Sequence, residues 1–412
     1  MRTGYEVAKV AVVGQGYVGL PLAMAATSAG WHVTGIDVSS RIVDGLNAGK
    51  SHVEDVSDSE LKSAIDRNLY LATTKGKVAS DSDICIICVP TPLDAAGLPD
   101  LSFLESAVRL VAEHLPENAL LVSESTSYPG TVRDFVVPLV ASLRSDGGKG
   151  MSFASAPERV DPRNDKWQMR NTPRLVSGVD KVSTERALDF YRSICEKVIE
   201  VSKPEVAEMA KLLENTFRQV NIALVNQLVP FCNEAGIDIR EVVEAAGSKP
   251  YGYMKFFPGA GVGGHCIPID PLYLLWKARQ VGVELPFVAK ADEINGGMPS
   301  YVASRLIELS KPSQGEQLLI LGVAYKAGIS DVRESPAEHV AKAIEGNGYK
   351  ALWSDPLVSK FHGFEKYGNQ SVKGAIVVTA QPGLPVKELA EKGVPILDCT
   401  GVFKGIPGVE QL

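Results

Sequence analysis

Short apolar runs that each lead into a glycine or a polar residue recur over the first 200 residues. The runs are Lys9–Val13, Trp31–Ile36, Asp83–Val89, Leu120–Ser123 and Ser152–Ser155. Strands of parallel sheets are buried on both faces and therefore show continuous apolar runs. The segment Leu20–Ala29, which follows the first run, is compatible with a helix. We therefore expect residues 1–200 to form an α/β domain with a doubly wound sheet.

The pattern becomes helical from Glu205 to Glu234, where apolar residues recur with the 3.6-residue period. These residues are Val206, Met209, Ala210, Leu213, Phe217, Val220, Ala223, Leu224 and Leu228. Between Val220 and Cys232 the helix is apolar on nearly every side, so we expect it to be buried between domains or against a second subunit. A central helical domain is predicted for residues 201–310.

The C-terminal part returns to alternating strands and helices. Its predicted strands are Gln317–Gly322, Tyr349–Trp353, Ala375–Thr379 and Pro395–Asp398, and its first helix begins near Pro336 and runs to about Gly346. Residues 310–315 have the composition of a linker. The chain is thus predicted to be an α/β protein with two doubly wound sheets, the second in residues 311–412, joined by a long central helical region.

Composition narrows the possible partners. The length of 412 residues suits two or three domains, and 45% hydrophobic residues exclude a mainly disordered chain. A net charge of −7 excludes a general attraction to nucleic acid or anionic lipid. No apolar run approaches the roughly 20 residues of a membrane span, residues 1–9 show no signal sequence, and six scattered cysteines do not suggest disulfides. We expect a cytoplasmic protein with no membrane partner.

A glycine-rich turn, Gly14-Gln-Gly-Tyr-Val-Gly19, follows the first predicted strand. Its first glycine allows a tight turn, the second lets a pyrophosphate approach the backbone, and the third lets the helix pack closely on the strand. Asp37 ends the second predicted strand, where a carboxylate binds the ribose 2′-hydroxyl and rejects a 2′-phosphate. The pattern predicts NAD rather than NADP, and a glycine turn kept for packing is the alternative. Arg41 could stack on adenine or be a solvated helix residue.

Polar residues follow two consecutive predicted strands, at Glu124-Ser-Thr126 and Ala156-Pro-Glu158. Because ligands bind at the carboxyl ends of parallel strands, these residues indicate one shared cleft. Cys85 and Cys88 form a CxxC pair, but residues three apart on a strand point to opposite faces, and neither a second pair nor a nearby histidine completes a metal site. We interpret them as structural and expect no metal.

The densest motif runs from Phe257 to Asp270 and contains four glycines, which make a flexible loop able to wrap a ligand. Asp270-Pro271 predicts the N-cap and first residue of a helix. Cys266 would then lie just before a helix N-terminus, where the dipole favours the thiolate. Cys266 is therefore a predicted nucleophile, with an inert buried cysteine as the alternative. For His265 we expect a packing or backbone role.

Two pairs of polar residues remain open on spacing alone. Lys211 and Asn215 share one face of the predicted helix, which is more often a wet surface than a site. Lys326 and Arg333 follow the first strand of the second sheet, where cations could clamp phosphates or be ordinary surface residues.

Together these motifs closely resemble the nucleotide-sugar 6-dehydrogenases of the UDP-glucose/GDP-mannose dehydrogenase family. The resemblance spans nearly the whole chain, and its motifs occur in the family's order: Gly14–Pro21, Val89–Pro92, Glu124–Thr126, Pro157-Glu158, Lys211 with Asn215, Gly263–Cys266 with Asp270, and Asp331-x-Arg333. Residues 125–130, 157–162 and 265–271 look most like the UDP-N-acetylglucosamine branch. The UDP-glucose branch typically has a lysine at the position of Ile269.

The resemblance implies a Rossmann-type NAD domain and a four-electron oxidation of the sugar C6 alcohol to a carboxylate, through a thiohemiacetal and a thioester on Cys266. It implies that Thr126 and Asp270 hold a water that assists proton transfer. Lys211 and Asn215 would stabilise oxyanions, and Glu158 would be the base for thioester hydrolysis.

The same resemblance implies two sets of binding residues. Those for NAD are Gly14, Gly16, Tyr17, Val18, Gly19, Asp37, Arg41, Pro90, Thr91, Thr126 and Arg333, the last at the pyrophosphate. Those for the UDP-sugar are Glu158, Arg159, Val160, Lys211, Asn215, Phe257, Gly259, Gly261, Gly263 and Lys326. A homodimer or higher homo-oligomer is expected.

Three residues that flank the expected sugar pocket depart from the pattern of the acetamido-sugar branches: Ala260, Arg163 and Lys255. UDP-N-acetylglucosamine is the leading predicted substrate, and UDP-N-acetylmannosamine or UDP-glucose is the alternative. A two-electron β-hydroxyacid dehydrogenase is more distant, because it needs neither Cys266 nor a second α/β domain. A non-catalytic nucleotide-sugar binding protein would bind the same ligands without forming NADH.

Overall fold

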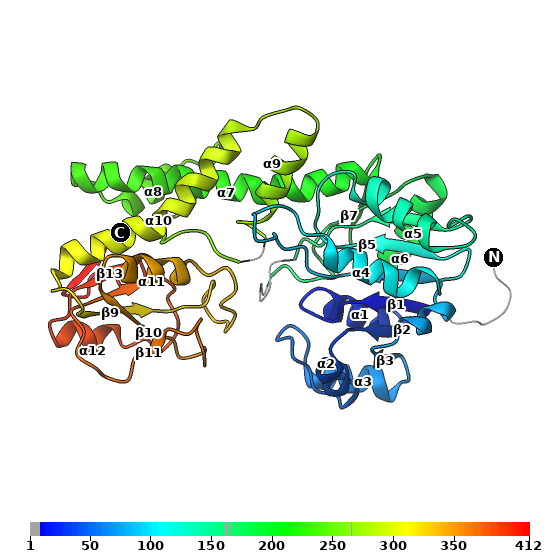
Figure 1. The fold of residues 1–412 in the computed structure, drawn as a ribbon, viewed down its shortest axis with the longest axis horizontal. Helices are drawn as coiled ribbons and strands as arrows, with labels where there is room; N and C mark the ends of the chain where they lie inside the picture. Colours follow the sequence, from blue (N-terminus) through cyan, green and yellow to red (C-terminus); the bar gives the residue numbers. More distant parts are fainter. Residues whose placement is uncertain (1–8, 161–163, 165, 265) are drawn as a thin grey trace. The chain divides into compact units, whose positions relative to one another are not determined.

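The computed structural model describes residues 9–160, 164, 166–264 and 266–412 (Figure 1). The chain divides into two compact units, Met1–Leu213 and Glu214–Leu412. The division lies inside helix α7 (Pro204–Ala235), which spans 32 residues. Each unit is built on a largely parallel sheet, so the predicted α/β class with two doubly wound sheets is confirmed. The domain borders expected near residues 200 and 310 stay predictions.

The described part of the first unit contains an eight-stranded sheet with the order β3-β2-β1-β4-β5-β6-β7-β8. Neighbouring strands run parallel except β6 and β7. The strands are β1 (Lys9–Val13), β2 (His32–Ile36), β3 (Tyr70–Thr73), β4 (Ile84–Ile87), β5 (Leu120–Ser123), β6 (Ser152–Ser155), β7 (Arg174–Gly178) and β8 (Val198–Glu200). The strand order reverses between β1 and β4, which is where doubly wound sheets bind ligands.

Helices cover both faces of this sheet because successive strand residues point to opposite sides. Val10 and Val12 enter the apolar cluster under α1 (Gly19–Ser28), α2 (Ser40–Asn47), α3 (Asp58–Asp66) and α6 (Lys181–Ile194). Ala11 and Val13 enter the cluster under α4 (Ser102–Ala112) and α5 (Val137–Leu143). Where the structure describes this unit, its other short helices are the 3-10 helix η1 (Gly76–Asp81) and the π-helix η2 (Thr131–Val136).

Cys85 and Cys88 are buried in the two different clusters, as expected for structural cysteines on opposite faces. The predicted strand Asp83–Val89 is shorter in the structure, since β4 ends at Ile87 and Cys88 already belongs to the following loop.

The second unit contains a parallel sheet with the order β11-β10-β9-β12-β13-β14. The strands are β9 (Gln317–Leu321), β10 (Lys350–Ser354), β11 (Glu365–Lys366), β12 (Gly374–Val377), β13 (Ile396–Asp398) and β14 (Val409–Gln411). The helices are α8 (Ile239–Ala246), α9 (Asp270–Gln280), α10 (Pro286–Ser310), α11 (Pro336–Gly346) and α12 (Val386–Glu391). Leu318 and Ile320 pack under α10 and α11, whereas Leu319 and Leu321 pack under α12.

Helix α7 buries only one side of its apolar segment within this chain. Val229 and Cys232 join the core beside Val302 of α10. The opposite side carries four apolar side chains that are 39–63% exposed: Phe217, Leu224, Leu228 and Phe231. The expected burial against a second subunit therefore stays a prediction, and burial within this chain is incomplete. Among the described residues no helix combines the length and apolarity of a bilayer span.

Candidate active site

The glycine turn Gly14–Gly19 connects β1 to α1 at the point where the strand order reverses. Gly14 has a φ of +89°, and a Cβ there would lie 2.5 Å from the carbonyl oxygen of Cys88, just after β4. A Cβ on Gly19 would lie 1.8 Å from the carbonyl oxygen of Gly14, whereas one on Gly16 would meet no protein atom within 4 Å. Packing therefore requires Gly14 and Gly19. The small size of Gly16 instead suits the close approach of a pyrophosphate to the backbone at the α1 N-terminus.

This geometry predicts that substitutions of Gly16 and Gly19 separate cofactor binding from folding. Gly16→Ala should leave thermal unfolding unchanged and weaken NAD⁺ binding by about 10-fold or more, because its methyl group takes the space of the pyrophosphate. Gly19→Ala should lower stability by about 2–4 kcal/mol, because its Cβ overlaps the carbonyl of Gly14. Calorimetric titration and thermal unfolding measure the two effects. An unchanged NAD⁺ affinity in Gly16→Ala would contradict this assignment.

Asp37 lies directly after β2 beside the glycine turn. Its carboxylate accepts hydrogen bonds from the backbone N–H groups of Gln15 and Ser39, both at 2.9 Å. It is thus held at the position where a carboxylate meets a ribose hydroxyl in such turns. Tyr17 in the turn and Arg41 in α2 are both exposed, and the two interpretations of Arg41 stay open.

The loops after β4 and β5 are joined by side-chain hydrogen bonds. Ser125 Oγ accepts from Val89 N at 3.0 Å and donates to Val89 O at 2.7 Å. Thr91 Oγ1 donates to Thr126 O at 2.5 Å. Pro90 and Thr91, two predicted cofactor residues, therefore lie beside Thr126, which resemblance also places at the cofactor.

The loop after β6 carries Glu158, Arg159 and Val160, all half-buried. The Glu158 carboxylate accepts from Val160 N, and Arg159 Nη1 donates to Pro173 O at 2.8 Å. Glu158 N also donates to Glu124 O at 3.4 Å. Three consecutive strand ends, those of β4, β5 and β6, are thus linked along one edge of the sheet, and the shared cleft expected there stays a prediction. Arg163 lies outside the described residues.

Glu208 is a buried carboxylate on α7 that the sequence analysis did not single out. It accepts from Gly130 N at 2.6 Å and from Val132 N at 3.0 Å, and so connects α7 to the loop that follows Thr126. Burial raises the pKa of Glu208 to about 7. Its spacing of three residues from Lys211 on one helix face was the signal that could have found it.

This raised pKa predicts a pH dependence of stability. Between pH 4.5 and 7 the folded state binds more protons at Glu208 than the unfolded chain does, so its contribution to the free energy of unfolding falls as the pH rises, in total on the order of 3 kcal/mol. Denaturant unfolding of Glu208→Gln across this range should show a flatter pH dependence than wild type. Parallel curves for the two proteins would contradict the prediction.

Lys211 and Asn215 lie one turn apart on α7 and are only 7% and 6% exposed, so they do not form a wet surface. Asn215 Nδ2 donates to Asp270 Oδ2 at 2.5 Å. The prediction that Asp270 is the N-cap of the next helix is wrong, since Ile269 occupies that position and Asp270 is the first residue of α9. The Asp270 carboxylate instead accepts the hydrogen bond from Asn215, which lies on α7.

Cys266 lies in the turn that leads into α9, where its carbonyl oxygen accepts from Asp270 N at 2.9 Å. Its expected position just before a helix N-terminus is therefore confirmed. All six cysteines are among the described residues, and Cys266 is exposed while the other five are buried. Cys266 is therefore not a buried cysteine, and its role as a nucleophile stays a prediction. His265 lies outside the described residues.

The glycine loop 257–264 packs on the segment that follows β9. Gly264 N donates to Glu334 O at 3.3 Å, and a Cβ on Gly263 would lie 2.8 Å from Pro336 Cδ. A Cβ on Gly264 would lie 3.1 Å from the ring of Tyr325. The loop that leads to Cys266 therefore needs glycine where it meets the second sheet.

The start of this loop is held by α7 and α8. Asn226 Oδ1 accepts from Gly259 N at 3.0 Å, and the Arg240 guanidinium lies 5.7 Å from the centre of the Phe257 ring. Two of the residues that depart from the family pattern lie in this region. Ala260 is buried in the loop. Lys255 is exposed and forms an ion pair with Glu244 of α8.

A glycine with positive φ follows the first strand of the second sheet, as Gly14 follows β1 in the first sheet. Gly322 follows β9 with a φ of +74°, and a Cβ there would lie 1.8 Å from the carbonyl oxygen of Thr379, after β12. Lys326 and Arg333 lie in the loop that begins here, where Arg333 Nη2 donates to the carboxylate of Asp331 at 2.6 Å. The predicted contact of these cations with phosphates stays a prediction.

The six predicted catalytic residues belong to different units. Thr126, Glu158 and Lys211 are in the first, whereas Asn215, Cys266 and Asp270 are in the second. Within the units the structure brings together Asn215 with Asp270, and the strand ends that carry Thr126 and Glu158.

Comparison with known proteins shows similarity over most of the chain. Three models of the UDP-glucose/GDP-mannose dehydrogenase family match in order: the NAD binding domain at residues 8–195, the central domain at 205–296 and the UDP binding domain at 319–382. A UDP-N-acetyl-D-mannosamine dehydrogenase from Pyrococcus horikoshii is 34% identical over 380 residues, which cover 91% of this chain and 90% of the relative.

Two solved structures extend the similarity to the fold. A UDP-D-ManNAc dehydrogenase from Pyrococcus horikoshii matches with a TM-score of 0.87 at 32% identity and covers 98% of both chains. A UDP-glucose dehydrogenase from Pyrobaculum islandicum matches with a TM-score of 0.88 at 27% identity and covers 100% of this chain and 98% of the other.

Proposed function

This chain belongs to the UDP-glucose/GDP-mannose dehydrogenase family, and we propose that within it the protein oxidises C6 of UDP-N-acetylmannosamine to a carboxylate with two NAD⁺. The observation that carries the chemistry is the exposed Cys266. It lies four residues before Asp270, whose buried carboxylate is bonded to Asn215. The sequence alone favoured UDP-N-acetylglucosamine. The names of similar relatives favour the mannosamine alternative, which we adopt.

The residues of the first unit fit NAD⁺, which accepts the hydride of each oxidation when it is bound. The space beside Gly16 and the α1 N-terminus suit its pyrophosphate, and the Asp37 carboxylate suits its ribose. Thr91, Pro90 and Thr126 would line the same edge of the sheet. Arg333 would bind the pyrophosphate.

The first oxidation turns the C6 alcohol into an aldehyde. The ammonium group of the largely buried Lys211 and the amide of Asn215 would stabilise negative charge on the C6 oxygen as the hydride leaves. Thr126 and Asp270 would hold the water that takes the hydroxyl proton.

The second oxidation uses Cys266. Its thiolate adds to the aldehyde carbon and forms a carbon–sulfur bond, and the resulting thiohemiacetal loses a second hydride to become a thioester. Glu158 then takes a proton from water as that water attacks the thioester carbonyl. The carbon–sulfur bond breaks, the Cys266 thiolate leaves and the carboxylate product forms.

The remaining predicted residues would bind the nucleotide sugar. Lys326 supplies a cation at the edge of the second sheet, and the loop from Phe257 to Gly263 offers backbone N–H groups. Arg159 and Val160 would flank the sugar beside Glu158.

The test is the amount of NADH formed for each UDP-sugar consumed, measured with UDP-N-acetylmannosamine, UDP-N-acetylglucosamine and UDP-glucose. Two NADH with the first sugar, at the highest kcat/KM of the three, support the proposal. Two NADH with another sugar would move the substrate and keep the chemistry. One NADH, or none, would refute the four-electron reaction.

The exposed stripe on α7 predicts self-association. Four apolar side chains on one helix face, Phe217, Leu224, Leu228 and Phe231, suit a second copy of the chain. Light scattering at micromolar concentration should give at least the mass of a dimer, and Leu224→Glu with Phe231→Glu should give a monomer. A monomeric wild-type protein would contradict this.

A further inference from the structure

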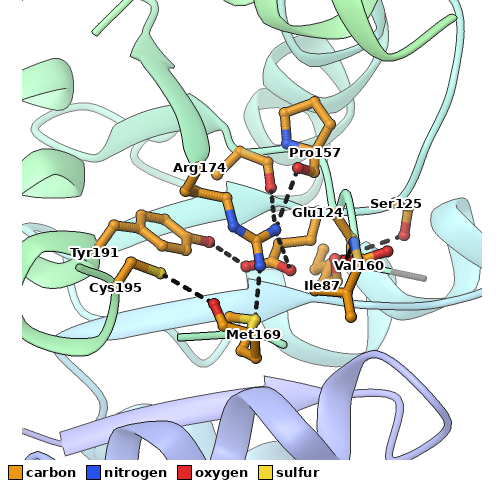
Figure 2. A network of polar contacts seen from close by, with 11 residues as sticks. Ile87, Glu124, Ser125, Pro157, Val160, Met169, Arg174, Tyr191 and Cys195 are labelled. Carbon is orange, nitrogen blue, oxygen red and sulfur yellow. Dashed lines mark hydrogen bonds and ion pairs between the residues drawn. The ribbon is translucent and has the colours of Figure 1, made fainter. Parts of the chain in front are cut away.

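A buried ion pair lies under the strand ends of the first unit. Arg174, the first residue of β7, has a side chain that is 2% exposed, and its partner Glu124 has one that is 0% exposed. Arg174 Nη1 donates to Glu124 Oε2 at 3.1 Å, and the hydroxyl of Tyr191 donates to Glu124 Oε1 at 2.5 Å (Figure 2). The network thus includes residues from three separate parts of the sequence.

The same guanidinium holds the loop that carries Glu158. Arg174 Nη1 also donates to the carbonyl oxygens of Ala156 at 3.3 Å and Pro157 at 3.2 Å, and Nη2 contacts Met169 Sδ at 2.8 Å (Figure 2). Pro157 is the residue directly before Glu158, and Glu158 N donates to the carbonyl oxygen of Glu124. Arg174 and Glu124 therefore fix the backbone on both sides of the peptide bond that begins Glu158.

Stability alone is a poor explanation for this arrangement. Removing two charges from water costs several kcal/mol per ion, and apolar side chains of similar volume often serve a core equally well. A planar guanidinium, however, can direct several N–H groups at fixed angles, which apolar packing cannot do. The network is therefore suited to fixing the geometry at the end of β6.

We propose that Arg174 is a positioning residue that holds Glu158 in place for thioester hydrolysis. This inference rests on the proposed function. Glu158 has to meet a water at the thioester carbon, and general-base catalysis loses about 100-fold when the base is displaced by about 1 Å. Arg174 touches no reacting atom, so its loss should slow the hydrolytic step and leave the two oxidations in place.

The test compares Arg174→Lys with the control Arg186→Lys. Lysine at 174 keeps the charge and cannot reach Glu124 and two carbonyl groups at once. The loop of Glu158 follows the end of β6, and Arg186 contacts the start of that strand. It donates to Ser152 Oγ at 3.1 Å and also to Asp83 O at 3.4 Å. The control thus perturbs the start of β6, at the end away from the loop of Glu158.

For Arg174→Lys we expect kcat to fall about 10- to 100-fold while kcat/KM for the UDP-sugar changes less than about 3-fold. A burst of NADH should precede the slow phase, and intact mass spectrometry should find most Cys266 acylated. Arg186→Lys should show neither. Tyr191→Phe, which removes one hydrogen bond to Glu124 and keeps the ring, should shift kcat in the same direction by a smaller factor.

Several outcomes would overturn the inference. These are equal losses of kcat and kcat/KM in Arg174→Lys, a Cys266 that stays unmodified during turnover, and the same behaviour in the Arg186→Lys control. If Arg174→Lys does not fold, Tyr191→Phe decides between the same outcomes. A wild-type enzyme that forms fewer than two NADH per sugar would instead refute the proposed function, and with it this inference.

Discussion

Replacing Cys266 by serine should reduce formation of the uronic acid by about 1,000-fold or more. A serine hydroxyl stays protonated near neutral pH and is a poor nucleophile without an adjacent base. In hydrolysis of a serine ester, the departing alkoxide would also be a poorer leaving group than the thiolate. The exposed position of Cys266 just before α9 suits the thiolate form, which a hydroxyl cannot supply. Chromatography of the UDP-sugar products, together with NADH absorbance, measures the loss.

The matched control is Cys232→Ala. Cys232 is buried in the core of the second unit and plays no part in the proposed chemistry. This variant should keep the ratio of two NADH per sugar while losing some stability, because it removes a buried sulfur. Acid production at the wild-type rate by Cys266→Ser would refute the thioester mechanism.

Replacing Lys211 by methionine should lower kcat/KM by about 100- to 1,000-fold, which is the usual loss when one oxyanion donor is removed. Methionine preserves most of the length of the side chain and its place on α7. Because the side chain is largely buried and methionine removes a polar group from it, the melting temperature should stay unchanged or rise. Steady-state kinetics and thermal unfolding therefore separate a catalytic role for Lys211 from a structural one.

Arg218→Met is the control for this substitution. Arg218 lies on the same helix and is exposed. The Arg218→Met variant removes one positively charged side chain from the surface and leaves the charge of Lys211 on the buried face unchanged. We expect its kcat/KM to stay within about 2-fold of wild type, since isolated surface charges contribute little. Equal losses in both variants would show that the effect is one of overall charge.

Much of the fold follows from local pattern. The apolar runs located β1, β2, β5 and β6, and glycine spacing identified Gly14 and Gly19, whose substitution would bring a Cβ onto a backbone oxygen. Such positions can be predicted from the sequence because their constraints are local. A strand buried on both faces needs apolar residues, and a tight turn with positive φ favours glycine.

Helix α7 shows where local pattern was insufficient. The period of apolar residues predicted the ends of α7 within one residue. It did not predict which side of the helix is buried: Phe217 and Leu224 are exposed, whereas Lys211 and Asn215 are buried. Burial depends on which elements pack on each side of a helix, and those elements come from distant parts of the sequence.

Sequence alone therefore determined the α/β class, the two doubly wound sheets, the NAD-type glycine turn and the position of Cys266 before a helix, because each depends on neighbouring residues. The tertiary structure decided the partners of the charged groups. Asp270 bonds to Asn215 across 55 positions and Arg174 to Glu124 across 50. A carboxylate that a local pattern assigns to a helix cap or to solvent takes another partner when folding buries it beside a stronger donor.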